Sequence, residues 1–382
     1  MSAPGFTGFG AAEYARRRAA LEAEMARAGV DHAVLYGANR SGAAVSWLTG
    51  WPVTREAHVL VTRGEPDVLL VSFFNHVPEA RRRAAAADVR FAGDVPAATV
   101  VELLRERGAG SAAVGLVGPL PWKQYAALAD GRRVVDLSGA HTRLRMVKSA
   151  EEIAALRAAA ALTDLSASAL VDDPVAGCSE HELTARIEAA YVSRGGMHHI
   201  HYLGITPMAA PERAVPAQWP RDRRVESGDL LTFELSAAVA PDYSGQVLRT
   251  VTVDVEPTPE VRRLHDVAEE ALARITARLR PGVHAEELVA AADVIEEAGF
   301  TTVDDLVHGF GGGYLPPVIG SRSRAIRPTP DVTLQAGMTV VVQPNVATPD
   351  LRLGVQTGEL LLVTDAGAER LHTFPRGMVQ AG

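Results

Sequence analysis

The sequence contains two related heptapeptides, Gly228-Asp-Leu-Leu-Thr-Phe-Glu234 and Gly337-Met-Thr-Val-Val-Val-Gln343, each an apolar run between a glycine and a polar side chain. The segments before them also correspond, because a long helical stretch, a turn with proline and glycine, and a second helix precede each heptapeptide. The chain therefore repeats a helix–helix–strand unit. Two such units pack most naturally about a pseudo-twofold axis, with one curved sheet covered by helices on its outside. In that arrangement Glu234 and Gln343 face one central cleft.

The chain before this repeat has a different pattern. Short apolar runs alternate with helical stretches and are separated by glycine and proline, which is typical of a small α/β domain. Ser149 and Glu152 then have the spacing of a capping box, in which each side chain accepts a hydrogen bond from the other residue's backbone N–H. A long helix is therefore expected to begin near residue 150. We predict an α/β domain over residues 1–145 and an α+β domain over residues 146–382.

Composition excludes several classes of protein. The chain has 38 lysines and arginines against 46 aspartates and glutamates, a net charge of −8, so it lacks the basic surface that binds nucleic acids or anionic membranes. Cys178 is the only cysteine, which excludes an internal disulfide and a cysteine-built metal site. The first ten residues lack the basic start and apolar core of a leader, and no apolar run approaches the length of a membrane span. We expect a cytoplasmic protein.

Five motifs are spread along the chain: Lys148-Ser-x-x-Glu-Ile153, Gly228-Asp229, His308-Gly-Phe-Gly311, Gly337-Met338 and the strand pattern over 354–364. Together they resemble the creatinase/aminopeptidase P/prolidase family. The resemblance covers nearly the whole chain and implies a small N-terminal α/β domain followed by a pita-bread domain with an internal pseudo-twofold repeat. Peptidases of this family hold two divalent metal ions with two aspartates, one histidine and two glutamates, whose anionic oxygens bridge the ions and an activated water.

The five ligand positions of that family are occupied differently here. In chain order they fall on Glu234, Gln246, His308, Gln343 and Gly358, with Glu359 the nearest carboxylate to the last. Neutral amides do not offset the charge of two dications. A misalignment by one residue would restore Glu359 but would leave both glutamines. We therefore expect no dinuclear metal centre and no cofactor.

Loss of metal within this family does not imply loss of chemistry, since creatinase cleaves a C–N bond without a metal ion. The segment Tyr314-Leu-Pro-Pro317 is similar to that of the small-substrate hydrolases, and Leu315 stands where the peptidases carry a second histidine. The segment 207–219 also lacks the histidine of a peptidase cleft. We predict a metal-independent hydrolase of a C–N bond in a small, polar, nitrogen-containing, non-peptide substrate. The alternatives are an Xaa-Pro metallopeptidase with unusual ligands, a lyase or cyclase, and a non-catalytic binding module.

Histidines supply the candidate proton carriers, because the unperturbed imidazole pKa lies near neutrality. In His198-His-Ile-His201, strand alternation places His199 and His201 on one face and His198 on the other. We predict that His199, His201, His308 and Glu234 are catalytic. One alternative is a single metal ion held by His199, His201 and His308, and another is a purely structural cluster. For Glu234 the alternative is a salt bridge to Arg249.

Six further residues are predicted to bind the substrate. Gln246 and Gln343 would orient a polar group because amides both donate and accept hydrogen bonds, and Tyr314 would donate one. The family resemblance implies a homodimer in which the N-terminal domain of one subunit reaches the cleft of the other. The remaining substrate-binding candidates are His198, His76 and Arg55, of which Arg55 would bind a substrate carboxylate from the partner subunit.

Overall fold

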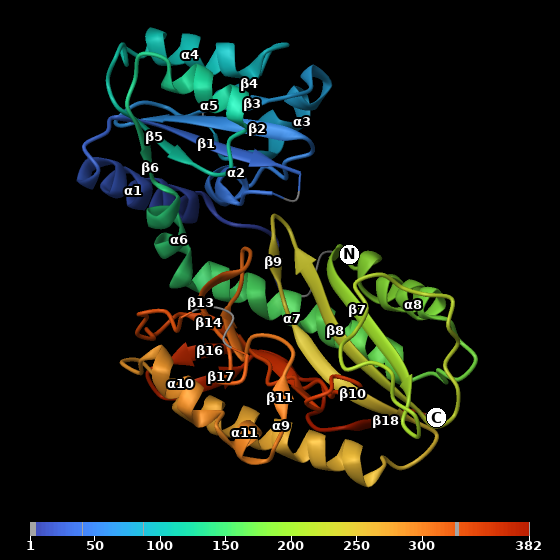
Figure 1. Ribbon diagram of the computed structural model, residues 1–382. Helices are drawn as coiled ribbons and strands as arrows, with labels where there is room; N and C mark the ends of the chain where they lie inside the picture. The colour runs from blue at the N-terminus through green and yellow to red at the C-terminus, as the bar shows by residue number, and fades with distance from the viewer. Residues whose placement is uncertain (1–4, 40, 87, 325–327, 382) are drawn as a thin grey trace. The chain divides into compact units, whose positions relative to one another are not determined.

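The computed structural model describes residues 5–39, 41–86, 88–324 and 328–381 (Figure 1). Its chain divides into two units. One contains Gly8–Arg145 together with the short loop Ala240–Asp242, and the other contains most of the chain from Met146 onward and the segment that ends at Thr7. The end points of the predicted domains, residues 1 and 382, lie outside the described residues.

The N-terminal unit is a six-stranded sheet with helices on both faces. The sheet has the order β4-β3-β2-β1-β5-β6, in which β1, β5 and β6 are parallel to one another and β2 is antiparallel to both of its neighbours. Its elements are α1 (Ala11–Arg27), β1 (His32–Ala38), α2 (Ala44–Thr49), β2 (Glu56–Thr62), β3 (Val68–Val71), a 3-10 turn (Phe74–His76), α3 (Val77–Arg83), β4 (Asp88–Phe91), α4 (Pro96–Glu106), β5 (Val114–Val117), α5 (Trp122–Ala129), β6 (Val134–Asp136) and α6 (Ser138–Met146).

Strand β1 shows why this sheet is covered on both sides. Ala33 and Leu35 belong to a core with Leu21 of α1, whereas Val34 belongs to a second core with Leu104 of α4. Successive strand residues point to opposite faces, so a continuous apolar strand requires helices on both faces.

The C-terminal unit contains a long curved sheet with helices on its outside. Its elements are α7 (Ala150–Val171), α8 (Glu180–Val192), β7 (Met197–Pro207), β8 (Asp229–Val239), β9 (Tyr243–Ser244), β10 (Val247–Val253), α9 (Pro259–Arg278), α10 (Ala285–Ala291), α11 (Val294–Glu297), β11 (Thr301–Thr302), β12 (Val307–Gly309), β13 (Leu315–Ile319), β14 (Thr339–Val342), β15 (Val346–Ala347), β16 (Gly358–Thr364), β17 (Gly367–Arg370) and β18 (Val379–Ala381).

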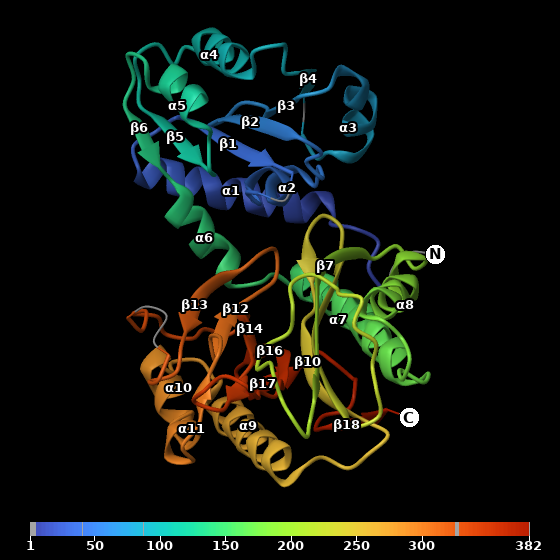
Figure 2. The same ribbon diagram turned by 45° about the vertical axis from the view of Figure 1, so that its right-hand side comes forward.

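The order of the strands displays the internal repeat. The main path of the sheet is β13-β12-β14-β16-β10-β8-β7, so β16 and β10 meet at the centre and β14 and β8 occupy corresponding places beside them. The first heptapeptide contributes the beginning of β8, and the second contains all of β14. Figures 1 and 2 show α7 and α8 alongside β7 and β8, and α9 to α11 alongside the other half of the sheet. The two repeats therefore lie in one sheet, and equivalent side chains approach its centre.

The predicted helix start after Lys148 is confirmed. The Ser149 side chain accepts the backbone N–H of Glu152 at 3.2 Å, and the Glu152 carboxylate accepts that of Ser149 at 2.9 Å. The helix that follows, α7, is the one helix of the described chain that is long and apolar enough to cross a membrane by length and composition, contrary to the prediction from apolar runs. Because 61% of its most apolar window is buried inside the protein, α7 is weak evidence for a membrane span.

Candidate active site

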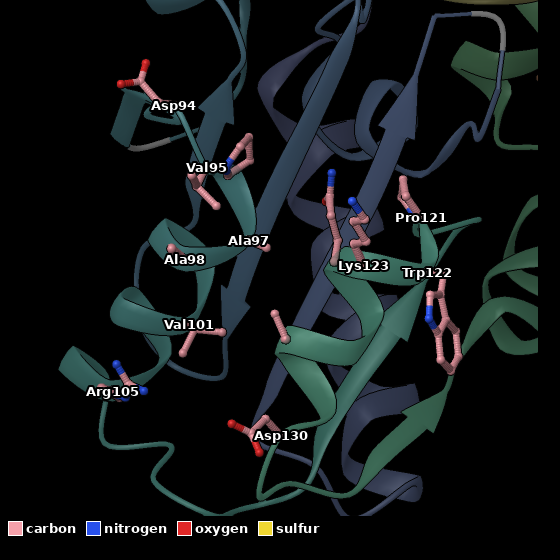
Figure 3. Close-up of a pocket in the computed structure, with 13 residues that line it drawn as sticks. Asp94, Val95, Ala97, Ala98, Val101, Arg105, Pro121, Trp122, Lys123 and Asp130 are labelled. Atoms are coloured by element: carbon pink, nitrogen blue, oxygen red, sulfur yellow. The ribbon is translucent and has the colours of Figure 1, made fainter.

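Each unit contains a cavity large enough to hold a small molecule. A groove of about 900 Å³ lies between α4 and α5 of the N-terminal unit and has apolar walls that include Val95, Val101 and Trp122 (Figure 3). Its charged side chains are spread around it, as Asp94 and Arg105 in Figure 3 illustrate. The second cavity, of about 410 Å³, lies in the C-terminal unit. Polar side chains from both sequence repeats converge on it, which is the usual character of a binding or catalytic site, and we call it the central cavity.

Five residues predicted from the sequence line the central cavity. Glu234 on β8 and Gln246 beside β10 come from the first repeat, and His308 on β12, Tyr314 before β13 and Gln343 after β14 come from the second. The Glu234 side chain and both amides are buried. The sheet therefore brings the equivalent residues Glu234 and Gln343 to one place, as the repeat predicts.

A chain of hydrogen bonds joins these side chains. The Gln246 Nε2 group donates to Glu234 Oε1 at 2.7 Å and to Gln343 Oε1 at 3.1 Å. The Gln343 Nε2 group donates in turn to Asp305 Oδ1 at 3.2 Å, and the Tyr314 hydroxyl donates to Asp305 Oδ2 at 2.9 Å. The two hydrogen-bonded glutamines thus each hold one carboxyl group, Gln246 that of Glu234 and Gln343 that of Asp305.

Asp304 and Asp305 are the residues that the sequence analysis missed. Both line the central cavity, so Glu234 is one of three carboxyl groups there. The available signal was a pair of aspartates shortly before the strand that contains His308, but neither is a metal-ligand position of the creatinase/aminopeptidase P/prolidase family. No lysine or arginine of the described chain lines the cavity. The site is consequently acidic although the expected metal ligands are reduced in number.

Burial and neighbouring negative charge raise the pKa values of Glu234 and Asp304. Burial, followed by the charges of Asp304 and Asp305, raises the pKa of Glu234 to about 8. Burial, with a smaller contribution from Asp305, raises the pKa of Asp304 to about 7. Burial lowers the pKa of His308 to about 4. Near pH 7 the cavity therefore holds a protonated Glu234, an Asp304 that titrates, and a neutral His308.

His308 has a defined orientation in the wall. Its Nδ1 atom donates to the Gly309 carbonyl at 3.3 Å, so Nε2 is the acceptor of the neutral ring. The ring stacks on Tyr314 with centroids 4.4 Å apart. This packing fixes the imidazole beside the acidic groups.

The other predicted histidines are placed differently. The pairing of β7 with β8 shifts register between His198 and Ile200, which indicates a β-bulge at His199. The bulge turns His198 and His201 to the same side, with ring centroids 4.5 Å apart, and neither lines the central cavity. The prediction that His199 and His201 lie on one face of the strand and His198 on the other is wrong, because strict alternation fails at a bulge. His199 packs against Phe310 with ring centroids 5.7 Å apart.

Arg55 and His76 belong to the N-terminal unit and do not line the central cavity of their own chain. The Arg55 guanidinium lies 5.6 Å from the centroid of the Phe73 ring, and His76 Nδ1 lies 3.0 Å from the Thr54 hydroxyl. Their action on the cleft of a second subunit stays a prediction.

The residues present do not fit two metal ions. In the described chain, groups of three or more histidine, cysteine or carboxylate ligand atoms within 4.8 Å of one another occur once, at Glu188, His198 and His201, outside the cavity. His199, His201 and His308 do not form such a group among the described residues. Glu359 does not restore the missing acid, because its buried carboxylate is bound by Arg249 and Arg370. Arg249 therefore pairs with Glu359, and the alternative of a salt bridge from Glu234 is wrong.

The surroundings of Gly358 leave no room for a metal-binding side chain at the fifth ligand position expected from the family resemblance. A Cβ atom there would lie 2.8 Å from Leu248 Cδ1 and 2.8 Å from the Val342 carbonyl oxygen, closer than real contacts allow. We expect Gly358→Ala to lower the free energy of unfolding by about 1–3 kcal/mol because of overpacking, measured by urea denaturation.

Gly139→Ala is the matched control for that substitution. A Cβ atom at Gly139 in α6 would meet only the end of the Arg143 side chain, at 3.7 Å, so stability should be unchanged or higher. Equal stability of Gly358→Ala and the wild type would show that position 358 can accept a side chain.

Comparison with known proteins identifies the same architecture. Residues 154–365 match the model of metallopeptidase family M24, and residues 17–147 match the creatinase/prolidase N-terminal domain. A probable dipeptidase PepE of Mycobacterium tuberculosis is 28% identical over 389 residues, 97% of each chain, and an Xaa-Pro dipeptidase of Pyrococcus furiosus is 28% identical over 238 residues, 62% of this chain and 66% of the other. The dipeptidase PepE structure from Mycobacterium ulcerans superposes with a TM-score of 0.79 at 26% identity, covering 98% of this chain and 99% of the other.

The fold alone is also shared with the Xaa-Pro dipeptidase from Bacillus anthracis, at a TM-score of 0.80 and 21% identity over 96% of this chain and 99% of the other. These comparisons confirm the predicted fold class and family resemblance, and the coarse statement that the chain is a hydrolase. They overturn the main functional prediction. A metal-independent hydrolase of a non-peptide substrate is the wrong expectation, because the matched family is one of metallopeptidases and the relatives are named dipeptidases.

Proposed function

This chain belongs to metallopeptidase family M24, and from that premise we propose that it hydrolyses dipeptides or other short peptides in the central cavity. The dipeptidase names of its relatives support a short peptide substrate. The observation that carries the proposal is the composition of the cavity wall, which has three carboxyl groups and no lysine or arginine among the described residues. Such a wall favours the positively charged amino terminus of a peptide.

The size and charge of the cavity support entry of the amino end first. Its volume of about 410 Å³ lies in the range of about 300–1,000 Å³ that small-molecule sites occupy. A peptide amino group, with an ordinary pKa of about 8, is mostly an ammonium at pH 7. We propose that Asp305 binds this ammonium, because its carboxylate is held toward the cavity by Gln343 and Tyr314. The substrate carboxylate then lies at the mouth, where Arg55 of a second subunit is its proposed partner.

The chain's own acids supply proton transfers for cleavage of an amide bond. Glu234 is protonated near neutrality and is held by Gln246, so it can give a proton to the amine that leaves. Asp304 titrates near pH 7, so it can accept a proton from an attacking water. Acid–base assistance of this kind contributes about 10²- to 10⁴-fold to a rate. His308, neutral and stacked on Tyr314, orients these groups.

The proposal is tested with purified full-length protein and a matched set of peptides. The set contains Xaa-Pro dipeptides, dipeptides without proline, and the same dipeptides acetylated at the amino group. Each is assayed after treatment with a chelator and again with added Mn²⁺ or Co²⁺, and release of the free amino acid is measured by chromatography. We expect hydrolysis of free dipeptides and at least about tenfold slower hydrolysis of the acetylated ones, which lack the ammonium.

Two outcomes would contradict the proposal. One is the absence of dipeptide hydrolysis under every metal condition. The other is equal cleavage of free and acetylated dipeptides, which would show that the acidic wall does not bind an amino terminus.

A further inference from the structure

Glu188, His198 and His201 form a cluster of ligand-type side chains away from the central cavity. Glu188 is on α8, and the two histidines are on β7, the strand that follows after the turn at Gly195 and Gly196. One ligand atom from each of the three lies within 4.8 Å of the other two. We call these three residues the outer cluster, because none of them lines the central cavity.

The β-bulge at His199 creates the outer cluster. Without the extra residue, His198 and His201 would point to opposite faces of β7. With it, their rings meet edge to face, 4.5 Å apart between centroids. Ile200 and Tyr202, on the same strand, line the central cavity. The strand thus presents one set of side chains to the cavity and the outer cluster to the helix α8.

His201 has the features of a metal ligand. Its side chain is only 2% exposed, and neither ring nitrogen has a hydrogen-bond partner among the described residues. Its Nδ1 atom lies 3.7 Å from the Glu188 carboxylate, beyond hydrogen-bond distance. The nearby Tyr191 hydroxyl is also buried and has no hydrogen-bond partner within the described part of the chain. Buried polar groups that bind nothing are rare and costly.

We propose that Glu188, His198 and His201 bind one Zn²⁺ ion. Two imidazoles and one carboxylate are a ligand set that zinc sites use, with water in the fourth position. Zinc ligands lie about 2.0–2.1 Å from the ion, so tetrahedral neighbours are roughly 3.3 Å apart, and small side-chain rotations close the present spacing. The imidazoles favour zinc over Mg²⁺ or Ca²⁺, which take oxygen ligands.

The exposure of the three residues is consistent with an accessible site. Glu188 is 46% exposed at its side chain, and His198 is exposed, so an ion can enter from solvent. His201 forms the buried end. The ion would link the last turns of α8 to β7, on either side of the turn at Gly195 and Gly196. This link would not depend on the chemistry in the central cavity.

Isothermal titration calorimetry of the full-length, chelator-treated protein with ZnCl₂ tests the site. We expect one equivalent of Zn²⁺ to bind at this site. The substitutions His198→Ala and Glu188→Gln should each weaken binding by at least about 100-fold, because loss of a ligand exceeds the 10- to 100-fold effect of removing a group that only supports one. Both residues are accessible, so both variants should fold. His181→Ala is the matched control, since His181 is an exposed histidine of the same helix, and its binding should equal that of the wild type.

The central cavity provides the second comparison. Glu234→Gln should leave binding at the outer cluster unchanged. The proposal is overturned if the protein binds no Zn²⁺, if binding is the same in His198→Ala and Glu188→Gln as in the wild type, or if Glu234→Gln alone abolishes it.

Discussion

Replacing Glu234 by glutamine is expected to lower kcat/KM for dipeptides by about 10²- to 10⁴-fold, because the variant loses the proton that the acid gives to the leaving amine. Glutamine has the same shape, and its carbonyl oxygen can still accept the Gln246 hydrogen bond seen at 2.7 Å. The loss would therefore be one of proton transfer. Steady-state kinetics on a free dipeptide measure it, and Glu226→Gln, at an exposed site, is the control with wild-type activity.

Stability provides an independent measurement on the same variant. The pKa of Glu234 rises from 4.5 to about 8 in the folded protein, so between these pH values the folded state binds more protons than the unfolded state. The free energy of unfolding of the wild type must then fall as pH rises through this window. Glutamine does not ionise, so Glu234→Gln should match the wild type near pH 4, below the unfolded pKa, and exceed it in stability at pH 9. Unaltered activity together with an unaltered pH dependence of stability would contradict the assigned role.

The second large effect is expected at Arg249. Its side chain is completely buried and bonds to the Glu359 carboxylate, to the Pro375 carbonyl at 2.7 Å and to the Gly358 carbonyl at 2.9 Å. Arg249→Met leaves the Glu359 charge buried with Arg370 alone. We expect a loss of about 3–5 kcal/mol in the free energy of unfolding, as for other buried ion pairs that lose one partner. Urea denaturation at pH 7 measures this loss.

Two comparisons make the Arg249 result specific. The double variant Arg249→Met/Glu359→Leu removes both charges and should recover part of the stability, because apolar replacements of buried pairs are tolerated. Arg352→Ala removes an exposed pair with Asp350 and should cost at most about 1 kcal/mol. If Arg249→Met lowered the free energy of unfolding by less than Arg352→Ala does, Arg249 would not stabilise the centre of the sheet.

The fold could be predicted because both copies of the repeat have the same local sequence pattern. A glycine, an apolar run and a terminal polar residue recur in Gly228–Glu234 and Gly337–Gln343, and this pattern determines both the strand and the side that faces the cavity. The bulge at His199 was not predictable in the same way. The alternation of apolar and polar residues does not show that the strand contains one additional residue. That residue nevertheless places His198 on the same side of the strand as His201.

The site was predicted in part for a related reason. Glu234, Gln246, His308, Gln343 and Tyr314 were identified through positions of the resembling family, and the structure places them together. Asp304 and Asp305 have no counterpart in that ligand set, so only tertiary structure shows that they face the same cavity. The prediction of the reaction was wrong because it was inferred from the metal ligands. Those residues limit which metal ions can bind, but they do not show whether the substrate is a peptide.

The crowding around Gly358 limits which residues position 358 can accept. An acidic side chain there would press against Leu248 and the Val342 carbonyl, so the substitution would cost stability. A smaller residue at position 248, together with a slight shift of the backbone at 342, would relieve that pressure. Position 358 can therefore carry a carboxylate only if its neighbours change with it.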